Sequence, residues 1–210
     1  MLNIGLVSSW HVHAAGYVRE LQASGKVHIA ALWDENPEKG RERAAEWKTE
    51  FEGDYDKFLA RGDFSAVICS SPTTMHPLLL SKAAAAKKDI FTEKLLAVSI
   101  AEAEKLAEDI RKAGVIFTIS LPLRCSPAVL YVKELVDSGS LGRVTGARFR
   151  RSHSGVSDKW LPDYWFDLSL TGGGAMMDLG AHPVYLLTFL LGQPKRLSGF
   201  TTNPFGTSSD

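Results

Sequence analysis

The sequence predicts an α/β fold in which an N-terminal doubly wound parallel sheet is followed by an incomplete α+β domain with an open, mainly antiparallel sheet. Over residues 1–120, short apolar runs alternate with helical patterns, as they do in a parallel sheet wrapped by crossover helices. After Pro122 this alternation gives way to a different pattern. The chain has 210 residues, of which 45% are hydrophobic and 23% charged, and this is an ordinary globular composition.

We therefore expect a dinucleotide-binding domain over residues 1–122 and a partial substrate and oligomerisation domain over residues 123–210. Buried parallel strands are short, continuous apolar runs. About six such segments are expected in the first domain, as in a Rossmann sheet. The strands that the sequence places are Leu2–Val7, Val27–Trp33, Ala66–Ser70, Asp89–Thr92 and Val115–Ser120.

Capping residues mark the helices between these strands. Asn36 precedes Pro37, which is the arrangement of a side-chain cap followed by proline at the first helical position. Ser99 and Glu102 have the spacing of a capping box. The expected helices are His13–Ser24 ending at Gly25, one opened by Asn36 and Pro37, Met75–Lys87, and one from Ser99 to Ala113 ending at Gly114.

The second domain mixes helices with alternating stretches. Val144–Ser154 alternates in the manner of a strand with one buried face. Because two strands alone are marginal and leave open edges, we expect a homo-oligomer through this sheet, or instability of the chain. The expected elements are a helix from Ser126-Pro127 to Asp137, the strand Val144–Ser154, a helix Ala175–Leu191 ended by Gly192, a strand Arg196–Thr202 and a mobile tail over 203–210.

Composition argues against several classes of function. The 24 basic and 24 acidic side chains cancel, so we expect neither a nucleic acid nor a membrane as a partner. No apolar run approaches the roughly 20 residues of a membrane span. The first residues lack the features of a signal peptide, so we expect a cytoplasmic protein. Cys69 and Cys125 have no metal-ligand spacing.

The stretch Gly172–His182 is the strongest candidate for chemistry. Three glycines lead into an apolar helix in which Asp178 and His182 are four residues apart, so on one continuous helix they share a face. A carboxylate one turn before an imidazole can orient the ring and raise its basicity, which suits a general acid/base. A buried helix with one satisfied Asp–His pair explains the same spacing.

The first strand-to-helix turn of a doubly wound sheet holds a dinucleotide pyrophosphate, normally through a G-x-G-x-x-G fingerprint. Here the turn contains Ser8, Ser9, Trp10 and His11, and the glycines are absent. Asp34 ends the second strand, where an acidic residue accepts hydrogen bonds from the adenosine ribose and repels a 2′-phosphate. We therefore expect NAD, with NADP disfavoured, although a surface Asp leading into a helix fits the pattern too.

Three further groups have both a functional and a structural explanation. His11 and His13 form an H-x-H pair typical of metal sites, but no third or fourth ligand is indicated nearby, so we expect no metal. Glu93-Lys94 follows a strand at the edge where ligands bind, and the lysine can stabilise a developing alkoxide. A solvated surface pair is the plain alternative, and His76 is equally explained as a capping or packing residue.

Together these motifs resemble one family, that of glucose–fructose oxidoreductase, inositol dehydrogenase and MocA (Gfo/Idh/MocA). The resemblance covers nearly the whole chain. It rests on motifs that are weak singly and strong in this order: Ala66–Ser71 with Pro72 and His76, Glu93-Lys94 with Leu96-Ala97, Arg124 with Ser126-Pro127, Ser138-Gly139 through Leu141-Gly142, and Gly172–His182.

The resemblance implies reversible hydride transfer between NAD(P) and a hydroxyl or carbonyl carbon of a sugar, cyclitol or related polyol. It implies that Lys94, Asp178 and His182 are catalytic. The cofactor-binding residues we expect are Ser8, Ser9, Trp10, His11, Asp34, Ser71, Pro72, Thr73, His76, Glu93 and Lys94, and those facing the substrate are Arg124, Arg151, His153, Trp160, Tyr164 and Trp165.

The sequence departs from the family pattern in three ways. Ser8-Ser9-Trp10 replaces the glycine fingerprint, Leu95 stands where proline follows the lysine, and members are usually longer than these 210 residues, which makes the second domain C-terminally short. The alternative hypothesis is a non-catalytic ligand- or cofactor-binding relative, whether a fragment or a degenerate enzyme. A metal-dependent lyase using His11 and His13 is a third, minor hypothesis.

Overall fold

The computed structural model of the chain describes residues 1–200 and 202. It divides into two compact units, Met1–Ser120 and Leu121–Asp210, close to the boundary after Pro122 that the sequence indicates. The tail 203–210, expected to be mobile, lies outside the described residues.

The first unit is built on one parallel sheet with the strand order β3-β2-β1-β4-β5-β6. This is the Rossmann order, so the predicted doubly wound sheet is confirmed. The short β3 is the strand that the sequence analysis did not place. The strands are β1 (Leu2–Val7), β2 (Val27–Trp33), β3 (Glu50–Phe51), β4 (Ala66–Cys69), β5 (Asp89–Thr92) and β6 (Phe117–Ile119).

The caps that the sequence predicts for α1, α2 and α5 are confirmed, whereas α3 was not predicted and α4 is shorter than the expected Met75–Lys87. The Asn36 side chain accepts hydrogen bonds from the N–H groups of Glu38 and Lys39, and Ser99 accepts one from Glu102. Both predicted glycine C-caps, Gly25 and Gly114, are left-handed. The helices are α1 (Ala14–Ser24), α2 (Pro37–Trp47), α3 (Tyr55–Ala60), α4 (His76–Ala85) and α5 (Ile100–Ala113), with a 3-10 turn η1 (Thr73–Met75) before α4.

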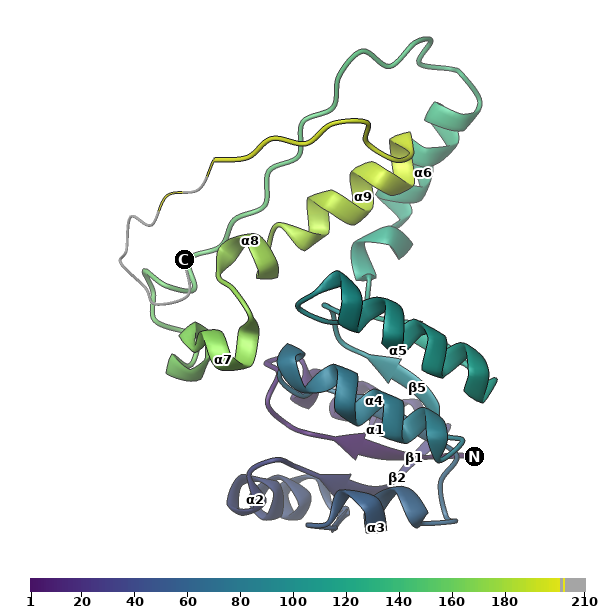
Figure 1. Cartoon of the computed structure of the whole chain (residues 1–210), viewed down its shortest axis with the longest axis vertical. Coiled ribbons are helices and arrows are strands. Elements are labelled where there is room, and N and C mark those ends of the chain that lie inside the picture. Colours follow the sequence, from purple (N-terminus) through teal and green to yellow (C-terminus); the bar gives the residue numbers. More distant parts are fainter. Residues whose placement is uncertain (201, 203–210) are drawn as a thin grey trace. The chain divides into compact units, whose positions relative to one another are not determined.

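Two apolar clusters fill the faces of this sheet. Helices α1 and α2 cover one face with a cluster that includes Leu6, and α3, α4 and α5 cover the other with a cluster that includes Val7 (Figure 1). Successive strand residues therefore point to opposite faces, each buried. A Cβ at Gly5 would lie 2.5 Å from Phe58 Cζ, so glycine is required where the Phe58 ring packs against β1.

The regular secondary structure of the second unit, over its described residues, consists of helices and 3-10 turns. Helix α6 packs with α9 and with the 3-10 turn η2. Its elements are η2 (Pro122–Cys125), α6 (Pro127–Asp137), η3 (Asp163–Phe166), α7 (Leu168–Thr171), α8 (Ala175–Asp178) and α9 (Ala181–Leu191). The predicted helix from Ser126-Pro127 to Asp137 is confirmed as α6.

Two strand predictions for this unit are wrong within the described residues. Val144–Ser154 and the described part of Arg196–Thr202 have no regular secondary structure, so the expected antiparallel sheet is not formed among them. Alternation decides only which side chains share a face, whereas a strand also needs a partner to accept its hydrogen bonds.

The predicted continuous helix Ala175–Leu191 is also wrong, because it breaks between α8 and α9. At the break, a Cβ on Gly180 would lie 2.3 Å from the Met176 carbonyl oxygen, so a residue with a side chain cannot occupy this close approach. Pro183 then falls in the first turn of α9, where a missing N–H costs little. Asp178 and His182 consequently belong to different helices.

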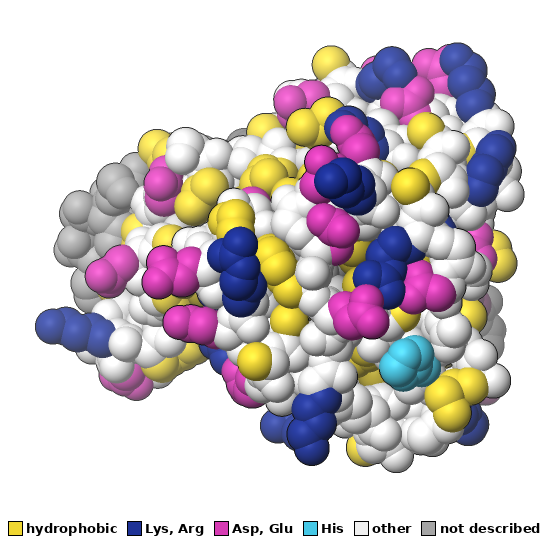
Figure 2. Space-filling view, turned by 90° about the horizontal axis from the view of Figure 1, so that it is seen from below, with side chains coloured by type: hydrophobic (Ala, Val, Ile, Leu, Met, Phe, Trp, Pro, Cys, Tyr) yellow, Lys and Arg dark blue, Asp and Glu magenta, His cyan; other side chains and the backbone are white. Residues whose placement is uncertain are grey.

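No single helix in the described part of the chain is long and apolar enough to cross a membrane; only the bent pair Leu168–Asp178 and Ala181–Leu191, at 49°, matches a span by combined length and composition. On the face shown in Figure 2, basic and acidic side chains are interspersed. Ion pairs of opposite sign occur elsewhere in the first unit too: the Arg61 guanidinium lies 2.7 Å from Glu50 and 2.6 Å from Asp63.

Candidate active site

The β1–α1 turn lies where β1 and β4 are neighbours and the strand order reverses, which is where doubly wound sheets bind dinucleotides. Ser8 has a φ of 69°, so a serine adopts the left-handed conformation that glycine supplies in the usual fingerprint. Its hydroxyl accepts a hydrogen bond from the Trp10 N–H at 3.0 Å. The Trp10 side chain is buried, so the turn accommodates the residue that looked hardest to fit.

Asp34 holds this turn in place. One carboxylate oxygen accepts hydrogen bonds from the Ser9 N–H at 2.8 Å and the Ser9 hydroxyl at 2.6 Å. The other accepts from the Asn36 N–H at 2.9 Å. Asp34 is 1% exposed, and a carboxylate has about four acceptor sites. Its main role is therefore to clamp the turn, with about one acceptor site left for a ribose hydroxyl.

Glu35 is a second carboxylate at this edge, which the sequence analysis missed. Burial and the neighbouring charge of Asp34 raise the pKa of Glu35 above its usual 4.5, against the lowering effect of the Ser8 hydroxyl. Its Oε2 atom is buried and has no hydrogen-bond partner among the described residues. The Asp-Glu doublet after an apolar strand was the available signal.

His76 joins the loops that follow β4 and β5. Its Nδ1 lies 2.7 Å from the Leu95 carbonyl oxygen and its Nε2 lies 3.2 Å from the Ser71 carbonyl oxygen. Burial lowers the pKa of His76, although both carbonyl contacts act to raise it. The side chain is fully buried, which favours a positioning role over the direct cofactor contact expected. Ser71 and Pro72 are buried beside it, and Thr73 opens η1.

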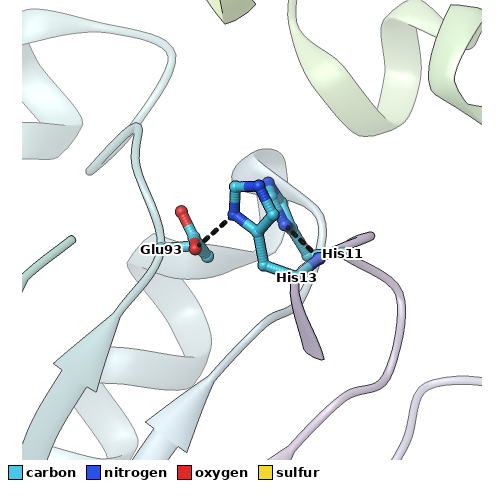
Figure 3. A group of neighbouring side chains, drawn as sticks. All are labelled: His11, His13 and Glu93. Atoms are coloured by element: carbon cyan, nitrogen blue, oxygen red, sulfur yellow. Dashed lines mark hydrogen bonds and ion pairs between the residues drawn. The ribbon is translucent and has the colours of Figure 1, made fainter. Parts of the chain in front are cut away.

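Glu93 is the centre of a hydrogen-bonded network at the end of β5 (Figure 3). His13 Nδ1 lies 2.9 Å from Glu93 Oε1, and the Tyr17 hydroxyl donates to the same oxygen. The Lys94 N–H donates to Oε2 at 3.1 Å. Burial raises the pKa of Glu93, but the hydrogen bonds from His13 and Tyr17 and the adjacent His11 outweigh it and lower the pKa to about 2. The carboxylate is therefore ionised at neutral pH.

Lys94 itself is buried, so the Glu93-Lys94 pair is not the solvated surface pair that was the plain alternative. The peptide bond between Lys94 and Leu95 is cis. Tyr17, which the sequence analysis did not select, also lies 3.0 Å from the Ser120 hydroxyl. Its position one turn along α1 from His13 was a signal for this contact.

In the second unit, His182 is buried near the start of α9, and its Nδ1 lies 2.9 Å from the Tyr185 hydroxyl. Asp178 Oδ2 lies 4.0 Å from His153 Nε2. The Gly155 N–H donates to His153 Nδ1 at 3.0 Å, which places the proton of the neutral ring on Nε2, facing Asp178. The structure therefore brings His153 to Asp178, and Tyr185 to His182.

The other expected substrate residues differ in what they contact. The Trp160 ring lies 4.9 Å from the His153 ring, centroid to centroid, and Trp160 is half exposed. The Arg124 guanidinium lies 4.6 Å from the centre of the Phe189 ring. Trp165 is 9% exposed, so it belongs to the interior of its unit and a substrate-facing role for it is disfavoured. Arg151 is exposed and Tyr164 is partly buried.

The strand order, the left-handed turn after β1 and the acidic end of β2 define a dinucleotide-binding Rossmann domain. A family model described as an oxidoreductase family with an NAD-binding Rossmann fold matches residues 4–121, and a GFO/IDH/MocA C-terminal domain model matches residues 129–209. The chain belongs to the Gfo/Idh/MocA family, and the resemblance inferred from its motifs is confirmed.

Several similar curated proteins are reductases and dehydrogenases named for sugars. A dTDP-3,4-didehydro-2,6-dideoxy-alpha-D-glucose 3-reductase of Streptomyces violaceoruber is 28% identical over 200 residues, which are 94% of this chain and 57% of that protein. A D-xylose 1-dehydrogenase [NADP(+)] of Haloarcula marismortui is 30% identical over 81% of this chain and 49% of its own. The chain thus spans about half the length of these relatives.

Solved structures agree on the fold. An oxidoreductase domain protein from Kribbella flavida has a TM-score of 0.80 at 27% identity, over 91% of this chain and 55% of that one. A levoglucosan dehydrogenase in complex with NADH and L-sorbose also has a TM-score of 0.80, at 22% identity, over 92% of this chain and 53% of its own.

Proposed function

We propose that the protein is an NAD(P)-dependent oxidoreductase that moves a hydride between the nicotinamide and a hydroxyl or carbonyl carbon of a sugar, cyclitol or related polyol. The observation that carries this proposal is the carboxyl edge of the first sheet. There the clamped turn at Ser8 and Ser9 and the buried Lys94 after β5 occupy the edge at which such sheets bind ligands. The sugar-directed relatives support the substrate class.

The residues of the first unit fit a dinucleotide. In the turn after β1, Ser8 adopts a left-handed conformation that glycine usually supplies, and α1 follows without a side-chain cap on its N-terminus, the helix end that favours an anion such as a pyrophosphate. Asp34 and Glu35 place two carboxylates at the end of β2, where their charge would repel a 2′-phosphate. We therefore propose NAD as the preferred cofactor over NADP.

We propose roles for the catalytic side chains of each unit separately. The nicotinamide, when bound, accepts or returns the hydride. In the first unit, Lys94 donates a hydrogen bond to the reacting oxygen and stabilises its alkoxide character. In the second, His182 takes the hydroxyl proton as a general base, with Tyr185 holding its Nδ1. Asp178, from the preceding helix, tunes the basicity of His182.

A non-catalytic, cofactor-binding relative is the second candidate. The observation that favours it is Trp10, whose bulk occupies the turn where glycines normally let the backbone approach a pyrophosphate. Its burial next to the turn weakens this argument. The two candidates differ in turnover, because only an enzyme reduces NAD in the presence of substrate.

Two measurements test the proposal. Quenching of tryptophan fluorescence on titration with NAD and NADP reports binding beside Trp10, with Trp10→Phe identifying its share of the signal. NADH formation with a panel of inositols, hexoses and sugar acids then reports turnover. We expect quenching at lower concentrations of NAD than of NADP, together with turnover of at least one polyol. NADP binding as tightly as NAD contradicts the cofactor preference, and binding without turnover favours the second candidate.

We also propose a cytoplasmic location and self-association. The sheet through which self-association was expected is not formed by the described residues, so the argument now rests on exposed apolar side chains of α6, namely Leu130 and Tyr131 at 49% and 62% exposed. Sedimentation at micromolar concentration tests this, and a stable monomer contradicts it.

A further inference from the structure

His11, His13 and Glu93 form a cluster that lies wholly within the first unit. One candidate ligand atom from each residue lies within 4.8 Å of the others. Figure 3 shows both imidazole rings and the carboxylate converging, with the histidines on the turn after β1 and the glutamate on the segment after β5. The two rings lie 4.5 Å apart, centroid to centroid. No other cluster of this kind occurs among the described residues.

The cluster supplies the ligand that the sequence pattern lacked. An H-x-H pair gives two imidazoles, and Glu93 follows 80 residues later along the chain. Two imidazoles and one carboxylate are the donor set of three-ligand zinc sites, which keep a fourth position open for water or a ligand oxygen. We propose that His11, His13 and Glu93 bind a divalent transition-metal ion of the zinc type at the carboxyl edge of the sheet.

Contacts around the cluster resemble the outer shell of a metal site. The Tyr17 hydroxyl donates to Glu93 Oε1 and lies 3.0 Å from the Ser120 hydroxyl, so the carboxylate is oriented from a second direction. Groups that hydrogen-bond to a ligating carboxylate fix its direction and raise metal affinity. The buried Glu93 carboxylate is already oriented to bind an ion, while the exposed His13 leaves a path from solvent to the site.

The ion competes with one hydrogen bond of the metal-free protein, whereas a second one helps to orient a ligand. His13 Nδ1 and Glu93 Oε1 are 2.9 Å apart, and an ion between them takes the place of the proton that they share. The His13 N–H donates to His11 Nδ1 at 3.1 Å, which fixes the His11 ring. Because imidazole nitrogens suit zinc, cobalt, nickel and copper, whereas magnesium and calcium prefer oxygen ligands, the site selects the former group.

The test is a titration of tag-free, chelator-treated full chain with zinc by calorimetry, and with cobalt by its visible absorption, without cofactor. We expect one ion per chain with the spectrum of tetrahedral cobalt. His13→Ala, at an exposed position, should weaken zinc binding more than about 100-fold, because removing an outer-shell partner alone costs about 10–100-fold. Tyr17→Phe, which removes such an outer-shell partner, should therefore weaken zinc binding about tenfold or more.

The matched control is His28→Ala, because His28 is an exposed histidine of β2 outside the cluster. It should leave zinc binding unchanged. Less than one bound ion per chain, or equal binding by His13→Ala and His28→Ala, overturns the proposal. Glu93→Gln is a second variant, and its thermal melt shows whether the buried network still folds; a folded Glu93→Gln protein that binds zinc normally also overturns it. None of these readouts depends on NAD binding, so they are independent of the proposed dehydrogenase activity.

Discussion

The two units hold their site residues in different ways. In the first, the side chains at the carboxyl edge of the sheet are buried and bonded to loops from other parts of the chain, as Asp34 is to Ser9 and His76 is to Leu95. In the second, the described residues of both expected strands are irregular. Both buried apolar clusters consist of residues of the first unit, and the buried apolar side chains of the second are Leu161, Trp165 and Leu186.

This difference teaches which part of the site is organised in advance. A side chain whose polar atoms are fixed by contacts on rigid elements stays within the narrow geometry that catalysis and binding need. The Asp34 and Glu93 networks meet that condition in the first unit. In the second, the His182–Tyr185 contact lies within one short helix.

The largest effect is expected on turnover. Lys94→Met should lower kcat by about 10²–10³-fold, as for loss of an electrostatic donor. His182→Ala should lower it by about 10²–10⁴-fold, as for loss of a general base. Asp178→Asn should do less and shift the pH profile. NADH formation is the measurement, and NAD affinity should stay nearly unchanged.

Lys105→Met, at a lysine on the exposed side of α5, is the matched control and should keep full turnover. Near-normal kcat for both Lys94→Met and His182→Ala would show that Gly172–His182 is only a helical segment and that Lys94 has a structural role.

Truncating a buried side chain should destabilise the first unit more than the second, because the first has the larger buried apolar core. Phe58 is fully buried in the first unit. Phe58→Ala should therefore lower the free energy of unfolding by about 3–5 kcal/mol. Leu186→Ala in the second unit should lower the free energy of unfolding by about 2 kcal/mol. This is the low end of the usual range, because few buried side chains surround Leu186. Urea unfolding followed by circular dichroism measures both. The contrast fails if Leu186→Ala destabilises the chain as much as Phe58→Ala does.

Asp34→Ala tests the clamp on the cofactor turn. The variant loses hydrogen bonds to Ser9 and Asn36, and because hydrogen bonds to a charged group are worth about 1.5–3 kcal/mol each, the free energy of unfolding should fall by at least that amount. The ratio of NADP to NAD affinity should rise, since one carboxylate is removed. Glu38→Ala, at an exposed position of α2, is the control. An unchanged melting temperature would refute the clamp.

The smallest effect is expected from Glu35→Gln. Because the folded-state pKa of Glu35 is raised above 4.5, its contribution to stability is fully present below pH 4.5 and is lost as pH rises through the folded pKa. At pH 7 the ionised carboxylate is therefore unfavourable, and the neutral glutamine should raise Tm, by about 2–4 °C or less. Thermal melts at pH 7 and pH 4 measure this, and the gain should disappear at pH 4. A gain of equal size at both pH values would point to another cause.

Much of the first unit follows from local sequence. The Leu2–Val7 and Val27–Trp33 strands and the caps at Asn36 and Ser99 lie where the sequence indicates, because apolar runs and capping side chains act over a few residues of the same segment. The family motifs were also sufficient to select Lys94 and His182 as candidate catalytic residues. No knowledge of tertiary contacts was needed for that selection.

Tertiary structure alone decided the rest. β3 is two residues long and exists through its pairing with β2, while Val144–Ser154 alternates correctly but forms no strand. The helix breaks at Gly180, where the backbone lies close to the Met176 carbonyl oxygen. Each of these outcomes depends on a neighbour that a periodic pattern does not specify.

The same reason separates the sequence from the site. An i,i+4 spacing predicted one continuous helix carrying Asp178 and His182; the structure breaks that helix between them and adds a contact of Asp178 with His153, 25 residues earlier in the chain. Glu93 meets His13 across 80 residues, and Asp34 meets Ser9 across 25. The sequence by itself determined the sheet, its caps and the residue types available for chemistry. In the first unit, only the packing of the sheet decided which of those residues touch, because such contacts are set by the whole sheet rather than by any segment.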